Sequence, residues 1–142
     1  MKPTVAVPES HRDLLVRPIT AVLATMLPSG FPHAQPVWCG FDGTNVLVST
    51  TLERAKGRNM AARPWATILV VDPDDTSRWI EIRGDVEITR EDAVELADRL
   101  TRLYTTHHRY YGGVFPVEQQ ERETRVVCRI RPTRVNLDAI HR

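Results

Sequence analysis

The chain has 142 residues and a mass of 16.2 kDa, a common size for one domain. Its 19 lysines and arginines against 18 aspartates and glutamates give a net charge of +1, without the basic excess of a general nucleic-acid-binding protein. No apolar run approaches the roughly 20 residues that span a bilayer. We therefore expect one domain over residues 1–142, in the cytoplasm, with neither nucleic acid nor membrane as partner.

The two cysteines, Cys39 and Cys128, form no CxxC pair and belong to no His/Cys cluster at metal-ligand spacing. Neither a disulfide framework nor a metal site is expected. Both residues are interpreted as packed thiols, because free cysteine is commonly buried.

The first half of the chain alternates short apolar runs with turn-forming residues. Residues 8–17 have a short helical pattern, and strands are predicted over 19–27, 33–41 and 45–51, the last two forming a hairpin across Asp42-Gly43. Thr50 and Glu53 have the spacing of a capping box and predict a short helix over 53–63. A fourth strand is predicted over 65–72.

The second half contains the clearest periodicities. Residues 79–88 alternate apolar and polar side chains, which is typical of a half-buried fifth strand with Trp79 on its polar side. Thr89 and Asp92 are expected to cap a longer amphipathic helix that ends in the basic segment 107–109. A sixth strand is predicted over 124–137. The fold class is therefore mainly β (α+β), a six-stranded antiparallel barrel with a few short helices and one longer helix between strands five and six; the connections are too short for a parallel sheet.

The densest group of candidate binding residues spans the end of the third strand and the start of the short helix. Hydroxyls, helical N–H groups and cations are the parts from which an anion site is built, and one phosphate group is the expected guest. The alternative is that Thr50 only caps the helix and the cations form a solvated face. The candidates are Ser49, Thr50, Thr51, Arg54, Lys56, Arg58 and Asn59.

Two further features could serve a flat ligand. Pro36 interrupts the strand ladder beside Val37 and Trp38, which leaves backbone groups free to meet an apolar ring; alternatively Pro36 marks a sheet edge and Trp38 fills the core. Trp79 on a charged strand face indicates either a subunit interface or a stacking surface. No serine has a GxSxG setting and no cysteine has a local histidine partner, so no catalytic residue is assigned, and an enzyme would depend on a cofactor.

Five segments in order, SGFPHAQPVWCGFDG, VLVSTTLERAKGRNM, ATILVVDPDD, SRWIEIRGDVEI and RVVCRIRPTRV, resemble the pyridoxamine 5'-phosphate oxidase-like (PPOX-class) split-barrel family. Within it they are most similar to the deazaflavin-dependent branch, whose oxidoreductases use coenzyme F-420. The likeness spans residues 19–137 and rests on the order and spacing of the segments. It implies an FMN-binding-protein-like split barrel that forms a homodimer with two cofactor clefts at the interface.

Carried over to this sequence, the resemblance implies that residues 49–59 hold the phosphate end of the cofactor, with Lys56 as the main contact. Pro36, Val37 and Trp38 match the strand along which the ring lies, and Arg78 and Trp79 match the segment that the partner subunit supplies. Residues 110–113 are expected to line the acceptor pocket. Gly57 departs from the family pattern, where a bulkier residue is common, and predicts a looser helix start.

The activity implied is transfer of a hydride between coenzyme F-420 and an unsaturated small-molecule acceptor. Two alternatives remain, an FMN-binding oxidoreductase of the same fold and a non-catalytic flavin or deazaflavin carrier or small-ligand binding module. The tail, residues 138–142, does not resemble the C-terminal substrate-binding sequence of true pyridoxamine phosphate oxidases, so that activity is not expected.

Overall fold

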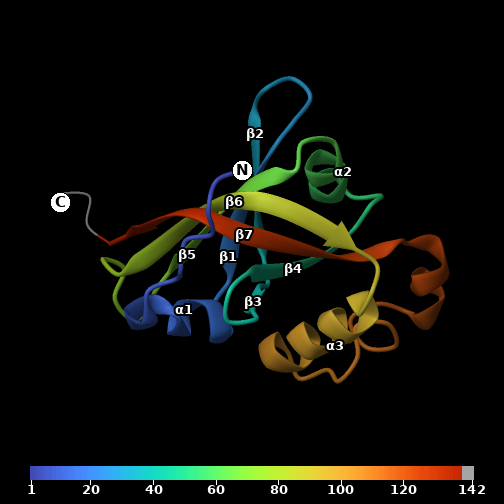
Figure 1. Cartoon of the computed structure of the whole chain (residues 1–142). Coiled ribbons are helices and arrows are strands. Elements are labelled where there is room, and N and C mark those ends of the chain that lie inside the picture. Colours follow the sequence, from blue (N-terminus) through green and yellow to red (C-terminus); the bar gives the residue numbers. More distant parts are fainter. Residues whose placement is uncertain (139–142) are drawn as a thin grey trace.

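The structure is a computed structural model that describes residues 1–138, and it is built on one strongly curled antiparallel sheet (Figure 1). The strand order across the sheet is β2-β1-β5-β6-β7-β4-β3. The seven strands are β1 (Ala21–Met26), β2 (Pro32–Val37), β3 (Gly40–Phe41), β4 (Val46–Thr51), β5 (Trp65–Val71), β6 (Trp79–Thr89) and β7 (Arg125–Leu137). The mainly β class and the antiparallel arrangement are as predicted.

The number of strands differs from the prediction of six, because the predicted second strand is divided into β2 and β3. Between them, Trp38 and Cys39 leave the ladder, and the backbone N–H of Cys39 donates to the hydroxyl of Tyr104 at 3.1 Å. β2 pairs with β1, whereas only β3 pairs with β4. The predicted hairpin is therefore wrong for β2, and the chain crosses from one edge of the sheet to the other at Trp38–Cys39.

Helices cover the ends of the sheet (Figure 1). They are the 3₁₀ segments η1 (Glu9–His11) and η2 (Val117–Arg122) and the α-helices α1 (Asp13–Val16), α2 (Ala55–Ala62) and α3 (Ala93–Tyr104). In the described residues no helix is long and apolar enough to pass through a membrane.

The expected helix caps are not formed. The N-cap of α2 is Arg54, and α3 follows Asp92 in the left-handed region, with no side-chain cap bond at either helix. Thr89 instead accepts a hydrogen bond from the N–H of Glu91, so its hydroxyl closes a local turn. α3 ends at Tyr104, before the basic segment 107–109 that was expected to end it.

The core fills the inside of the curled sheet. Along β6 the even-numbered residues from Ile80 to Val86 are buried and the odd-numbered ones point outward, as the alternation predicted. The pairing of β6 with β7 slips by one residue between Arg83 and Gly84, which makes a β-bulge. At the bulge, a Cβ on Gly84 would overlap the backbone oxygen of Arg131, so only glycine fits there.

We expect Gly84→Ala to lower the free energy of unfolding by at least about 1–3 kcal/mol, since the overlapping atom belongs to backbone that cannot rotate away. Gly40→Ala is the matched control. A Cβ there would have its nearest neighbour, a side-chain carbon of Leu100, at 3.5 Å, and the change should stay within about 1 kcal/mol. Urea denaturation of both variants measures the two changes. Equal stabilities of Gly84→Ala and Gly40→Ala would contradict the role of Gly84 at the bulge.

Candidate functional site

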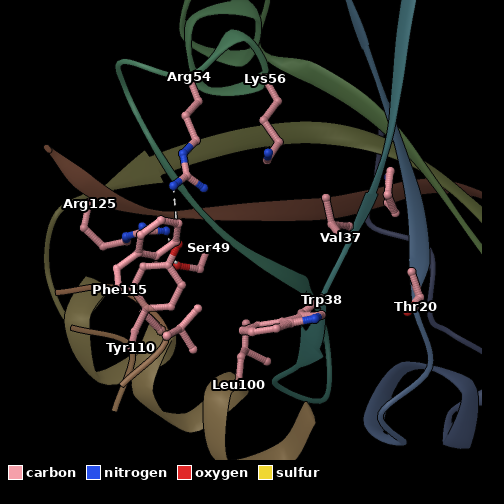
Figure 2. A pocket seen from close by; sticks show the side chains of 13 residues that line it. Thr20, Val37, Trp38, Ser49, Arg54, Lys56, Leu100, Tyr110, Phe115 and Arg125 are labelled. Carbon is pink, nitrogen blue, oxygen red and sulfur yellow. Dashed lines mark hydrogen bonds between the residues drawn. The ribbon is translucent and has the colours of Figure 1, made fainter. Parts of the chain in front are cut away.

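A cavity of about 440 Å³ opens where the edge of the sheet at β2 faces β4 and β7 (Figure 2). This volume lies within the range of small-molecule sites. α2 closes it from above, and α3 and the segment that follows α3 close it from below (Figure 2). The lining residues are Thr20, Pro36, Val37, Trp38, Ser49, Arg54, Lys56, Ala97, Leu100, Tyr110, Val114, Phe115 and Arg125.

One wall of the cavity is flat and apolar. The ring of Trp38 stacks on that of Tyr104, with centroids 5.4 Å apart and planes within 16°. The hydroxyl of Tyr104 accepts from the N–H of Cys39 and lies 2.9 Å from the carbonyl oxygen of Ile19, to which it can donate. The last residue of α3 therefore fixes the indole at the point where the chain leaves the sheet.

The opposite wall carries a buried guanidinium, that of Arg125. Its Nη1 donates to Ser49 Oγ at 3.2 Å, its Nε to the hydroxyl of Tyr111 at 3.2 Å, and its Nη2 to Glu123 Oε2 at 3.1 Å. The same guanidinium lies 4.3 Å from the centroid of the Tyr110 ring, a cation–π contact. This buried charge is therefore paired and hydrogen-bonded, which is what burial of an ion requires.

Glu123 joins Arg125 to a second arginine. Its Oε1 accepts from Arg54 Nη2 at 3.3 Å, and its Oε2 accepts from the hydroxyl of Tyr111 at 2.6 Å. Burial raises the pKa of Glu123, but the hydrogen bonds from Tyr111 and Gln119 and the charges of both arginines outweigh it and hold that pKa below its ordinary value. The carboxylate is therefore ionised at neutral pH.

Lys56 points into the cavity from the first turn of α2 (Figure 2). Its Nζ donates to Gln35 Oε1 at 3.3 Å. Burial lowers the pKa of Lys56, and the neighbouring charges of Arg54 and Arg125 lower it further. Three cations and one carboxylate thus meet at this wall, which gives it an excess of positive charge.

The structure brings together six of the predicted binding residues, namely Pro36, Val37, Trp38, Ser49, Arg54 and Lys56. The remaining candidates of the helix segment lie outside the cavity lining. Thr50 and Thr51 are fully buried, and their hydroxyls have no hydrogen-bond partner among the described residues. Arg58 is exposed and donates to the backbone oxygen of Glu53, and Asn59 is buried and donates to Thr25.

Trp79 begins β6, Arg78 directly precedes it, and neither lines the cavity of its own chain. Arg78 forms ion pairs with Asp13 and with Asp72, the latter at 2.8 Å, and these carboxylates raise the pKa of its guanidinium. Trp79 faces outward and pairs with Val71 of β5.

Sequence reasoning missed Arg125, Glu123 and Phe115. Alternation in the sequence assigns Arg125 to the polar side of the last strand. The only sequence signal of its role is that this cation directly precedes the apolar run 126–128. Of the segment 110–113, expected over the acceptor, Tyr110 does line the cavity. Nothing in the sequence placed Phe115 there, because the segment has no periodicity.

Gly57 has a structural reason that the sequence did not reveal. A Cβ at this position would overlap the backbone oxygen of Thr51, so glycine lets α2 lie directly against the end of β4. The glycine therefore brings the first turn of α2, with Lys56, close to the strand that carries Ser49. This close approach replaces the looser helix start that was expected.

Both cysteines are buried free thiols. Burial raises the pKa of Cys39 to about 11 and that of Cys128 to about 12, so neither is a thiolate at neutral pH. In residues 1–138, no group of three or more His, Cys, Asp or Glu side chains is arranged to hold a metal ion.

Comparison with known proteins places the chain in a family. The sequence model of the pyridoxamine 5'-phosphate oxidase family matches residues 7–138, and the chain belongs to that family. The solved structure of an F-420 reductase is 32% identical in sequence, with 92% of this chain and 98% of that chain covered and a TM-score of 0.78.

A conserved hypothetical protein of Mycobacterium tuberculosis is 25% identical over 97% of this chain and 88% of its own, with a TM-score of 0.67. HupZ of Group A Streptococcus, at 17% identity, covers 92% of this chain and 93% of its own with a TM-score of 0.66, and shows the shared fold. A search of the curated proteins gave no match.

We expect the side chain of Lys56 to titrate below the ordinary lysine range, and its pKa to rise in Arg54→Gln, because one of the two neighbouring charges that lower it is then gone. Lys2 and Lys56 are the two lysines of the sequence, so ¹³C-labelled lysine gives two side-chain NMR signals, and that of Lys2 is the internal control. An unchanged Lys56 titration in Arg54→Gln would contradict the charge arrangement described.

The lowered pKa of Lys56 also predicts that the free energy of unfolding depends on pH. Because the pKa of Lys56 is lower in the folded chain than in the unfolded chain, the unfolded state binds more protons between the two values. The contribution of Lys56 to stability therefore increases as pH rises through that window, whereas any anion that depends on its charge binds less well there.

Proposed function

We propose that this protein is a coenzyme F-420-dependent oxidoreductase that transfers a hydride between the deazaflavin and an unsaturated small-molecule acceptor. The observation that carries the proposal is the cavity itself, in which a flat apolar wall at Trp38 faces a wall of three cations, Arg54, Lys56 and Arg125. A planar ring with an anionic side chain complements both walls. The 32% identity to an F-420 reductase favours the deazaflavin over FMN.

The donor set fits the cofactor. Arg54 and Arg125 share one carboxylate, that of Glu123. Lys56 is half-buried and has no ion pair to a carboxylate in the described part of the chain, so this wall favours an anionic group. In the proposed complex, Lys56, Arg54 and Ser49 hold the phosphate end, and residues 36–38 lie along the ring. Asn59 acts indirectly, because its hydrogen bond to Thr25 joins α2 to β1, whereas Thr50, Thr51 and Arg58 do not line the cavity and have no part in the proposed complex.

When bound, reduced coenzyme F-420 would supply a hydride from its C5 carbon to one carbon of an electron-poor double bond, and a proton from solvent would complete the reduction at the other. The chain contributes orientation and exclusion of water. Leu100, Val114 and Phe115 line the cavity with apolar side chains, which help to exclude solvent from it. Tyr104 fixes the indole of Trp38, which sets the plane along which the ring lies.

The proposal includes a homodimer. The outward side of β2, β1 and β5 presents apolar rows, because Val22 lies opposite both Pro36 and Leu69, and Ala24 opposite Ala34. Val22 is 42% exposed, and Trp65 on the same side of β5 is 49% exposed. A second copy of the chain is the occupant that fits, since an uncovered apolar sheet face of this kind marks an interaction surface.

This outer face reaches the cavity, because Pro36 belongs to both. Trp79 points to the same side of the sheet, through its pairing with Val71. A partner seated on the face would therefore bring its own residues to the mouth of the cavity. This supports the assignment of Arg78 and Trp79 to the cleft of the partner subunit.

Anaerobic titration with coenzyme F-420 and, in parallel, with FMN tests the proposal. We expect the deazaflavin to bind more tightly, and Lys56→Ala to weaken its binding by about 1–3 kcal/mol, the scale of a lost charged hydrogen bond. Lys2→Ala is the matched control, since it removes the only other lysine and should change nothing.

The outcomes separate the alternatives. Binding of FMN alone would replace the deazaflavin assignment by a flavin oxidoreductase. Tight binding of reduced F-420 without oxidation by any member of a panel of enones and quinones would indicate a carrier. An unchanged affinity in Lys56→Ala would remove Lys56 from the site.

The dimer is tested by Val22→Arg, which places a charge in the centre of the apolar rows. We expect the wild-type chain to sediment as a dimer at micromolar concentration and Val22→Arg as a monomer, because an unpaired charge cannot be buried at the interface. Val117→Arg is the control, since Val117 is similarly exposed, at 58%, but lies on η2. A wild-type monomer would contradict the shared cleft.

A further inference from the structure

Two of the cations that line the cavity, Arg54 and Arg125, are already paired with an anion of the chain, the carboxylate of Glu123, which lies behind the lining residues. The side chain of Glu123 is only 7% exposed, and its two oxygens are divided between two arginines. Oε1 accepts from Arg54 and from Gln119, and Oε2 accepts from Arg125 and from Tyr111. The carboxylate thus lies between the two guanidiniums and accepts hydrogen bonds from both, which leaves less of their charge for an incoming anion.

Lys56 is outside this network. Its hydrogen bond goes to the neutral side chain of Gln35, and in residues 1–138 no ion pair joins it to a carboxylate. A ligand anion therefore meets one full positive charge, at Lys56, and two guanidiniums whose charge Glu123 has partly neutralised. A second negative charge on the ligand would gain little from the arginines and would be repelled by the carboxylate.

We propose that Glu123 determines the charge of the phosphate group that the cavity accepts, and that it favours a phosphodiester group, which carries one negative charge, over a phosphomonoester group, which carries two. The inference rests on the proposed function, because the phosphate group of coenzyme F-420 is a phosphodiester, with the carboxylates of that cofactor further along its tail, and the phosphate group of FMN is a phosphomonoester. Glu123 then selects between the two cofactors by repulsion of the wrong one, an arrangement that specific sites commonly use.

The test compares wild type with Glu123→Gln, which keeps the shape and one acceptor oxygen but removes the charge. We expect the affinity for FMN to increase by about tenfold, the effect of one charge-assisted contact, and that for F-420 to change much less. Riboflavin, which has the ring of FMN without its phosphate, should bind both proteins equally. Equal changes for FMN and riboflavin, or no change for FMN, would overturn the proposal.

Two further variants separate charge from structure. Glu121→Gln removes the same charge at an exposed position two residues away and should leave the preference unchanged. Glu123→Asp keeps the charge on a shorter side chain, so it should keep the wild-type preference even where packing is disturbed. Glu123→Asp also serves as the test variant if Glu123→Gln fails to fold. A gain of FMN affinity in Glu123→Asp, which keeps the charge, would then contradict a role for that charge.

A second arm needs no cofactor. Thermal unfolding is measured with inorganic phosphate, a dianion at pH 8, and with dimethyl phosphate, a monoanion. We expect phosphate to raise the melting temperature of Glu123→Gln more than that of wild type, and dimethyl phosphate to act on both alike. If neither F-420 nor FMN binds the wild type, the proposed function fails, but this phosphate experiment still tests the role of Glu123. Equal stabilisation of wild type and Glu123→Gln by phosphate would overturn that role.

Discussion

The burial of one guanidinium, that of Arg125, is the constraint on which the cavity depends. A guanidinium at the start of β7 with its side chain only 5% exposed requires acceptors around it, and Glu123, Tyr111 and Ser49 supply them. These contacts draw the segment between α3 and β7 over the sheet. As a result Tyr110 and Phe115, which come from that segment, form a wall of the cavity.

The cavity also depends on the interruption of the sheet edge. The chain passes from β2 at one edge to β3 at the other through Trp38 and Cys39, and Tyr104 takes the hydrogen bond that a neighbouring strand would otherwise make. The indole is thereby fixed against the end of α3. On the opposite side, Gly57 lets α2 approach β4 and brings Lys56 over the opening. The flat wall and the cationic wall face each other for these two separate reasons.

The sequence predicted the site in part because the relevant residues are close together in the chain. Ser49, Arg54 and Lys56 occupy one strand end and the helix that follows, and Pro36 to Trp38 form one strand end, so local pattern was sufficient to find them. Thr50 and Asn59 are polar residues of the same strand end and helix, yet both are buried. Spacing along a segment does not reveal which side of it faces a cavity, because that depends on what packs against it.

The sequence by itself determined the mainly β class, the order of the elements and the family, because alternation along a strand and turn residues are local properties. The tertiary structure alone decided that the sheet has seven strands, that Arg125 joins the cationic wall and that Glu123 pairs with Arg54 behind it. Both facts depend on contacts between residues far apart in the chain, such as that between Cys39 and Tyr104. Those contacts are set by the way the sheet curls and the helices pack on it, which no local pattern records.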